Sequence, residues 1–310
     1  MSKQLLSIMI PCYNEEDSLP ELLSCLSALV DEEKNYDFEI LFVDDGSRDR
    51  TRKILLDKHN ADNRFCYLGL SRNFGKEAAL LAGFDYVRGD AVVMMDADLQ
   101  HPPRVVHQMI RAWEEGYLDV YGKRRDRKEN GWLRRKLSNT YYRLLEKTTR
   151  VEMIHNAGDF RLLDRKCIDA LKELRESQRY TKGMYSWIGF RKKEILFDVQ
   201  ERKEGKSSWS YYQLFNLAID GLTSFSILPL RIATVIGIFF SIVSFCYMVY
   251  VFVKAAIWGD PVQGFPTIIV LILFLGGIIL LSLGVIGEYI GKTYMEVKRR
   301  PVYFVDEYVK

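Results

Sequence analysis

The pattern of hydrophobic and polar positions divides the chain into two parts of different character. Before about residue 125, four short apolar runs predict buried strands, and four amphipathic runs between them predict helices. The predicted strands are Leu5–Pro11, Phe38–Asp44, Phe65–Ser71 and Ala91–Asp96, and the predicted helices are Leu19–Leu29, Asp49–Asn60, Lys76–Val87 and Arg104–Glu115. This alternation predicts an α/β domain with a mainly parallel, Rossmann-like sheet and right-handed crossovers.

Two long uncharged runs follow in the carboxy-terminal part. Ile232–Val253 holds 22 residues between Arg231 and Lys254, and a second run extends from Pro261 to Gly287. Each run exceeds the roughly 20 residues that cross about 30 Å of hydrocarbon as a helix. A pair of buried core helices is the alternative, but the short loop with Gly and Pro between the runs favours a hairpin of two transmembrane helices.

The flanking charges predict how this hairpin is oriented. Arg231 precedes the first run, and Lys292, Lys298, Arg299 and Arg300 follow the second, whereas the connecting loop carries one Lys and one Asp. The positive-inside tendency therefore places the amino-terminal domain and both termini in the cytoplasm. The predicted organisation is a cytoplasmic domain over 1–208, an interfacial amphipathic segment over 209–230, a transmembrane hairpin over 231–291 and a cytoplasmic tail over 292–310. We also expect no signal peptide at the amino terminus.

Composition looks ordinary until it is divided along the chain. The 310 residues are 48% hydrophobic, with a net charge of +3 and a mean hydropathy of -0.11. Segment 123–150, however, holds eleven Lys and Arg against three acidic residues. Trp132, Leu133, Leu137, Tyr141, Leu144 and Leu145 recur there at helical spacing, so the segment predicts a basic amphipathic helix on an anionic membrane surface. A solvated basic face is the alternative, and two membrane runs make a nucleic-acid partner the weaker interpretation.

Cysteine and histidine usage excludes two classes of site. The five cysteines are scattered and odd in number, with no CxxC pair, which suits a reducing compartment and disfavours zinc. The four histidines form no ligand cluster in the sequence.

Polar clusters follow all four predicted strands. They comprise Tyr13–Glu15, Asp44–Ser47, Arg72–Lys76 and Asp96–Gln100. Ligands of parallel sheets bind at the carboxyl ends of strands, so these clusters describe one site. Lys76 and Asp96 are among its predicted nucleotide-binding residues. The chain has no GxGxxG fingerprint and no P-loop. We therefore expect a metal ion to bind the phosphates of the ligand. Asp96, Asp98 and Gln100 alternate in an extended segment, and their oxygens suit Mg²⁺ or Mn²⁺.

Four motifs together resemble glycosyltransferase family 2. They are Pro11–Glu15 (PCYNE), Asp44–Ser47 (DDGS), Asp96–Gln100 (DADLQ) and Gly158–Leu162 (GDFRL). The resemblance covers about residues 5–210. Within the family, the chain is similar to the polyprenyl-phosphate glycosyltransferases, which include dolichyl-phosphate mannose synthases. The paired apolar runs match the bacterial, bactoprenol branch. The resemblance implies a GT-A-type fold and inverting transfer of one sugar from a nucleotide diphosphate-sugar to a membrane lipid phosphate.

The resemblance also implies roles for particular residues. Pro11, Tyr13 and Glu15 line the nucleoside pocket, Asp44 or Asp45 accepts from the base with Ser47 nearby, and Asp96, Asp98 and Gln100 hold the metal on the diphosphate. Asp159 is the catalytic carboxylate and Arg202 closes over the diphosphate. Arg124, Arg134 and Ser138 grip the acceptor phosphate. The chain departs from the family at Ser207–Ser208, where Ser-Lys is usual, and Lys206 is the substitute cation nearby.

The expected enzyme is a polyprenyl-phosphate glycosyltransferase of the bacterial inner membrane that uses Mg²⁺ or Mn²⁺. UDP-glucose is the first expectation for the donor, with UDP-N-acetylglucosamine and GDP-mannose as alternatives. A non-catalytic, membrane-tethered nucleotide-sugar binding protein is the rival from another class. A processive polysaccharide synthase is disfavoured because the chain lacks a Gln-x-x-Arg-Trp motif. Gly276–Gly277 and the Gly284/Gly287 pair would allow close helix packing, including in a homo-oligomer.

Overall fold

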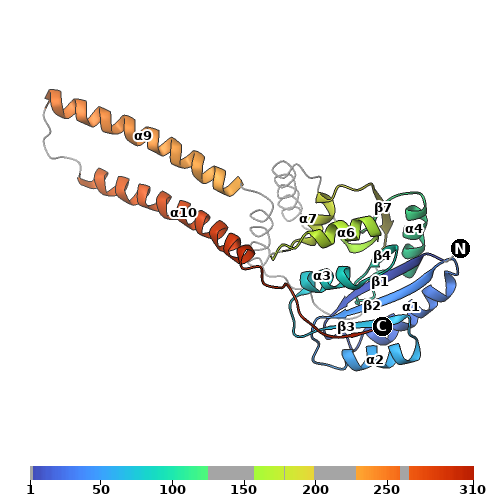
Figure 1. The fold of residues 1–310 in the computed structure, drawn as a ribbon. Coiled ribbons are helices and arrows are strands. Elements are labelled where there is room, and N and C mark those ends of the chain that lie inside the picture. Colours follow the sequence, from blue (N-terminus) through green and yellow to red (C-terminus); the bar gives the residue numbers. More distant parts are fainter. Residues whose placement is uncertain (1–2, 125–156, 178, 199–227, 259–264) are drawn as a thin grey trace. The chain divides into compact units, whose positions relative to one another are not determined.

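The computed structural model describes residues 3–124, 157–177, 179–198, 228–258 and 265–310 (Figure 1). These residues separate into two compact units, one formed by 1–209 together with 300–310, and the other by 210–299. The first unit contains an eight-stranded sheet, and the second contains two long helices.

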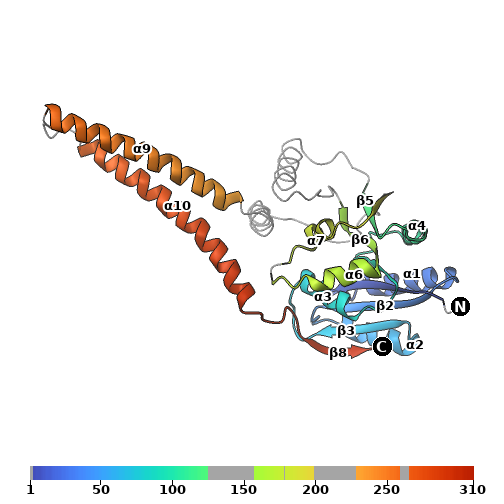
Figure 2. The same cartoon turned by 45° about the horizontal axis from the view of Figure 1, so that its top comes forward.

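The sheet is built around four parallel strands, as the sequence predicts. They are β1 (Leu5–Cys12), β2 (Asp37–Asp44), β3 (Phe65–Leu70) and β4 (Ala91–Met94), in the spatial order β4-β1-β2-β3. Their side chains are almost all buried because helices cover both faces of the sheet. The helices α1 (Leu19–Glu32), α2 (Thr51–Ala61) and α4 (Pro103–Glu114) pack on one face, and α3 (Lys76–Tyr86) packs on the other with α6 (Arg165–Glu173) (Figures 1 and 2).

Four further strands complete the sheet, in the order β7-β5-β6-β4-β1-β2-β3-β8. They are β5 (Asp119–Arg124), β6 (Ala157–Asp164), β7 (Lys192–Phe197) and β8 (Val305–Val309), and a short helix α7 (Thr181–Trp187) lies between β6 and β7 in the chain. Strands β5 and β7 run with the central four, whereas β6 and β8 run against them. The prediction of a mainly parallel α/β sheet is therefore confirmed, with two antiparallel strands that periodicity does not reveal.

Strand β8 lies in the segment 292–310 that the sequence predicts as a tail. It pairs with β3 at the edge of the sheet, where Figure 2 shows it beside β3. The amino-terminal unit is consequently completed by the last residues of the chain.

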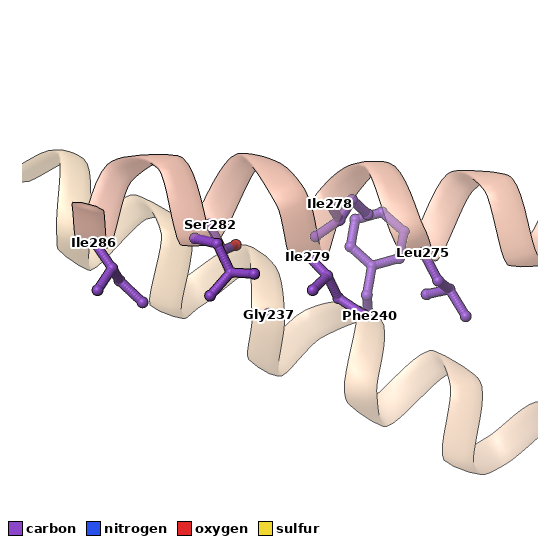
Figure 3. Close-up of a pocket in the computed structure, with 8 residues that line it drawn as sticks. Gly237, Phe240, Leu275, Ile278, Ile279, Ser282 and Ile286 are labelled. Atoms are coloured by element: carbon purple, nitrogen blue, oxygen red, sulfur yellow. The ribbon is translucent and has the colours of Figure 1, made fainter. Parts of the chain in front are cut away.

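The second unit contains α9 (Leu228–Trp258) and α10 (Phe265–Val297), which pack against each other. In the described part of the chain, one stretch, Phe274–Val297 in α10, is long and apolar enough to cross a membrane, and a shorter apolar stretch, Ile232–Tyr247, lies in α9. A second transmembrane helix thus stays a prediction. A cavity between the helices is lined by apolar side chains with Gly237 and Ser282, and the Phe240 ring reaches from α9 toward Ile278 of α10 (Figure 3).

Candidate active site

The polar loops after β1 and β2 are joined to each other by hydrogen bonds. The backbone amide of Asn14 donates to Ser47 Oγ at 2.9 Å, and its side-chain oxygen Oδ1 accepts from the backbone amide of Arg48 at 2.8 Å. Asn14 adopts a left-handed conformation (φ 55°), which Asn tolerates better than most residues. The neighbouring residue Tyr13 is 41% exposed, so it is accessible to a ligand at the carboxyl edge of the sheet.

The two adjacent aspartates at the end of β2 are buried, and each holds a different part of the site. Asp44 accepts from the Ser47 amide at 2.9 Å and from the Tyr67 hydroxyl at 3.0 Å. Asp45 accepts from the amides of Phe74 and Gly75 at 2.7 and 2.8 Å. Burial raises the pKa of Asp45, and these two backbone hydrogen bonds oppose that rise. Both carboxylates therefore have structural partners, beside the contact with a base that the sequence predicts for one of them.

Two glycines permit this close packing. Gly46 has φ 71°, and a Cβ there would lie 2.5 Å from the Arg72 carbonyl carbon. A Cβ at Gly69 would lie 2.6 Å from the hydroxyl of Tyr67, the side chain that holds Asp44. The loop after β2 can thus approach the loop 71–75 only because position 46 has no side chain.

The antiparallel strand β6 brings two acidic motifs together. Met94 of β4 pairs with Arg161 of β6, and continuing that register by two residues sets Asp96 opposite Asp159. The ammonium group of Lys76, the first residue of α3, lies between them, 2.6 Å from Asp96 Oδ1 and 2.8 Å from Asp159 Oδ2. One cation therefore joins the ends of β4, β6 and α3.

The same cluster keeps Asp159 ionised. Burial alone would raise the pKa of Asp159, but the charges of Lys76 and Lys182 outweigh it, and the pKa lies below the usual value. Burial would likewise lower the pKa of Lys76, but the charges of Asp96 and Asp159 raise it instead. Asp159 is thus an anion, and a weak proton acceptor, at neutral pH.

The loop that carries Asp96 and Asp98 is held by a histidine. His101 Nδ1 accepts from the Asp96 amide at 3.3 Å, and its ring stacks on Phe160, with centroids 4.3 Å apart. Within the loop, the backbone amide of Gln100 donates to Asp98 Oδ1 at 3.2 Å. No motif in the sequence assigns a role to His101, although its position directly after Gln100 is the signal that could have identified it.

The predicted metal ligands Asp96, Asp98 and Gln100 share this loop, and their donor set consists of oxygens, which fits Mg²⁺ or Mn²⁺. Among the described residues, no group of three His, Cys, Asp or Glu side chains is arranged to hold a metal ion by itself. The loop therefore fits a hard cation whose remaining ligands come from phosphate oxygens and water, which is the usual arrangement for Mg²⁺.

Behind Asp159, a buried ion pair supports the strand. Arg161 Nη1 lies 3.1 Å from Asp119 Oδ2 of β5, both side chains are almost fully buried, and the guanidinium stacks on Tyr185 of α7 at 3.6 Å. Beside it, Glu77 of α3 accepts from the Thr181 amide of α7 at 3.0 Å. Sequence reasoning missed these partners because Asp119 and Tyr185 belong to no motif; Arg161 stands inside the GDFR motif.

Not every predicted site residue belongs to the described structure. Arg134, Ser138 and Arg202 lie outside the described residues. The backbone of Arg124 ends β5 at the same edge of the sheet as Asp96, but its side chain lies outside the description. Pro11, Tyr13, Glu15, Asp44, Asp45, Ser47, Lys76, Asp96, Asp98, Gln100 and Asp159 all lie at that edge.

The chain thus combines an α/β sheet, which carries acidic loops at its carboxyl edge, with an apolar helical hairpin. Residues 7–172 match the model of glycosyl transferase family 2, and residues 228–293 match the GtrB C-terminal hairpin. The chain belongs to glycosyl transferase family 2, and it is a glycosyltransferase with a GT-A-like fold.

Relatives similar over nearly the full length include three bacterial proteins. An uncharacterized glycosyltransferase of Synechocystis sp. is 44% identical over 97% of this chain and 95% of its own. The SfII prophage-derived bactoprenol glucosyl transferase of Shigella flexneri is 40% identical over 97% of both chains. A prophage bactoprenol glucosyl transferase homolog of Escherichia coli is 39% identical over 97% of this chain and 98% of its own.

Proposed function

We propose that this enzyme transfers glucose from UDP-glucose to undecaprenyl (bactoprenol) phosphate at the cytoplasmic face of the bacterial inner membrane, with inversion. The observation that carries the proposal is the cluster of Asp96, Lys76 and Asp159 at the carboxyl edge of the sheet. The names of the relatives from Shigella flexneri and Escherichia coli support both the acceptor and the sugar.

The acceptor chemistry needs no strong base. The second pKa of a phosphate monoester is about 6, so a lipid phosphate is mostly dianionic at pH 7 and is already a nucleophile. An ionised Asp159 with a lowered pKa suits a group that orients the acceptor or stabilises positive charge on the sugar. Asp96, Asp98 and Gln100 would hold Mg²⁺ or Mn²⁺, which neutralises the charge of the departing diphosphate. Lys76 would stay beside Asp159 as a second positive charge.

The return of the chain to the sheet supports a two-span topology. Residues 1–209 and 300–310 belong to one folded unit, so the segment between them must cross a membrane an even number of times. The length and composition of α10 suit one crossing. A crossing by α9 then places both termini in the cytoplasm, as the positive-inside tendency predicts.

The deciding experiment incubates membranes that contain the protein with undecaprenyl phosphate, Mg²⁺ or Mn²⁺, and labelled UDP-glucose, UDP-N-acetylglucosamine or GDP-mannose. We expect a chloroform-soluble labelled lipid from UDP-glucose, and none after EDTA. If the labelled lipid forms from another donor, the proposed sugar is wrong. If no donor gives a labelled lipid, the protein is a non-catalytic nucleotide-sugar binding protein.

The Asp159→Asn variant tests the role of the carboxylate. We expect kcat to fall by about 10²–10³-fold, the range for the loss of one electrostatic stabiliser, by a similar factor at every pH between 6 and 9. If the wild-type rate instead falls on an acidic limb that the variant lacks, Asp159 acts as a general base. Asp169→Asn, an exposed aspartate on α6, is the control.

A further inference from the structure

The last strand of the chain packs against the loop that completes the donor site. Strand β8 pairs with β3, and just before it the Phe304 carbonyl accepts from the Ser71 amide at 2.9 Å. The ring of Phe304 lies beside that of Phe74, with centroids 6.4 Å apart. Both contacts fall on the loop 71–75, which connects β3 to α3.

That loop contacts several other parts of the site. Its amides at Phe74 and Gly75 hold Asp45, its backbone fills the space that the missing side chain of Gly46 leaves, and it ends at Lys76. A displacement of the loop would therefore move Asp45 and Lys76 together.

The same carboxy-terminal segment also holds the far end of α3. The Tyr303 hydroxyl donates to Asp85 at 2.6 Å, and Arg175 of α6 pairs with the same carboxylate at 2.7 Å. The Tyr308 ring packs edge-on against Tyr86, with centroids 4.9 Å apart. Helix α3, whose first residue is Lys76, is thus restrained at both ends by residues that follow the apolar hairpin in the chain.

We infer that the segment 303–309 is a positioning element of the donor site: it holds loop 71–75 and α3 so that Asp45 and Lys76 are preorganised for the nucleotide. Only six residues separate α10, which ends at Val297, from Phe304. The site therefore becomes complete only when the chain has passed through the hairpin and returned to the sheet. The inference rests on the proposed function in that the ligand of the site is taken to be a nucleotide.

The test uses full-length protein in detergent and the variant Phe304→Ala. Phe304 is 57% exposed, so its truncation removes the contact with Phe74 without opening the core. Phe304→Tyr keeps the ring and should behave as wild type. Asp306→Ala alters an exposed side chain of the same strand and serves as the matched control.

Two quantities are measured. In Phe304→Ala we expect hydrogen exchange at the amides of residues 71–75 to accelerate about tenfold without ligand, and the Kd for UDP with Mg²⁺ to rise about tenfold by calorimetry. Phe304→Tyr and Asp306→Ala should change neither. Unchanged exchange, or faster exchange with an unchanged Kd for UDP, would overturn the inference. Failure of the wild type to bind UDP or GDP would count against the proposed function alone, because the exchange measurement needs no nucleotide.

Discussion

At the scale of single residues, the site depends on one cation shared by two carboxylates. Asp96 and Asp159 lie 2.6 and 2.8 Å from the Lys76 ammonium group, and two anions so close to each other would repel without that cation. The sequence places Lys76 among the strand-end clusters but does not reveal this pairing, since residues 76, 96 and 159 come from three separate elements. Asp44 and Asp45 differ in a comparable way: they are neighbours in sequence, yet one holds Tyr67 and the other holds loop 71–75.

A single methyl group at Gly46 should damage the site. Gly46→Ala adds a Cβ where φ is 71° and the Arg72 backbone is 2.5 Å away, so loop 71–75 must move. We expect the affinity for UDP with Mg²⁺ to fall at least tenfold by calorimetry. Gly116→Ala is the matched control, because its φ is 88° with no atom within 4 Å of the added Cβ. Both variants should lose about 1 kcal/mol of stability from backbone strain; equal nucleotide affinity in the two would contradict the close packing at Gly46.

At the scale of elements, the Arg161–Asp119 ion pair joins β5 to β6. Removing one of its two charges should destabilise the protein more than removing both. Arg161→Met leaves Asp119 as an unpaired buried charge, and we expect a loss of about 3–5 kcal/mol of stability. The double variant Arg161→Met/Asp119→Leu removes both charges and should recover most of that loss. Thermal unfolding in detergent measures both. A double variant that is no more stable than the single one would show that the charges themselves are needed.

The ion pairs of Arg64, which link α1 to the turn between α2 and β3, should make the free energy of unfolding depend on pH. Arg64 pairs with Asp62 and with Asp31, both at 2.8 Å, and the hydrogen bonds from Arg64 hold the pKa of Asp62 below its usual value. A lowered folded-state pKa contributes stability that is present above the unfolded pKa of about 3.9 and is lost as pH falls through the folded value.

Asp62→Asn should therefore lower the melting temperature at pH 7, by the equivalent of about 0.5–1 kcal/mol because Arg64 is partly exposed. The difference from wild type should shrink as the pH falls below 4. Asp57→Asn, which changes an exposed aspartate on α2, is the control. A difference that persists unchanged at pH 3 would mean that the charge of Asp62 is not its cause.

At the scale of the whole molecule, the chain leaves the sheet-containing unit, forms the apolar hairpin, and returns to the same unit with β8. In a variant without native cysteines, we expect Asp260→Cys to react with an impermeant maleimide from outside the cell, and Lys310→Cys to react only after lysis. The reason is the proposed two-span topology, in which residues 1–209 and 300–310, which belong to one folded unit, lie on the same side of the membrane. Labelling of both positions from the same side would contradict the two-span topology.

Local patterns in the sequence are enough to predict the four central strands, the helices between them, and the loops that carry the acidic motifs. Periods of two and 3.6 residues reflect local geometry, and long uncharged runs reflect transfer into hydrocarbon, so both can be read one segment at a time. The observed bounds of β1 to β4 and of α1 to α4 lie within a few residues of those predicted.

Which of these loops meet depends on how the chain folds in three dimensions. The antiparallel register of β6 set Asp159 opposite Asp96, the start of α3 delivered Lys76 between them, and β8 joined the opposite end of the chain to β3. These pairings are formed by residues far apart in sequence, and a short strand such as Val305–Val309 carries too little local signal to specify its partner. The partner is decided by the open edge of β3, which exists only once the sheet has folded.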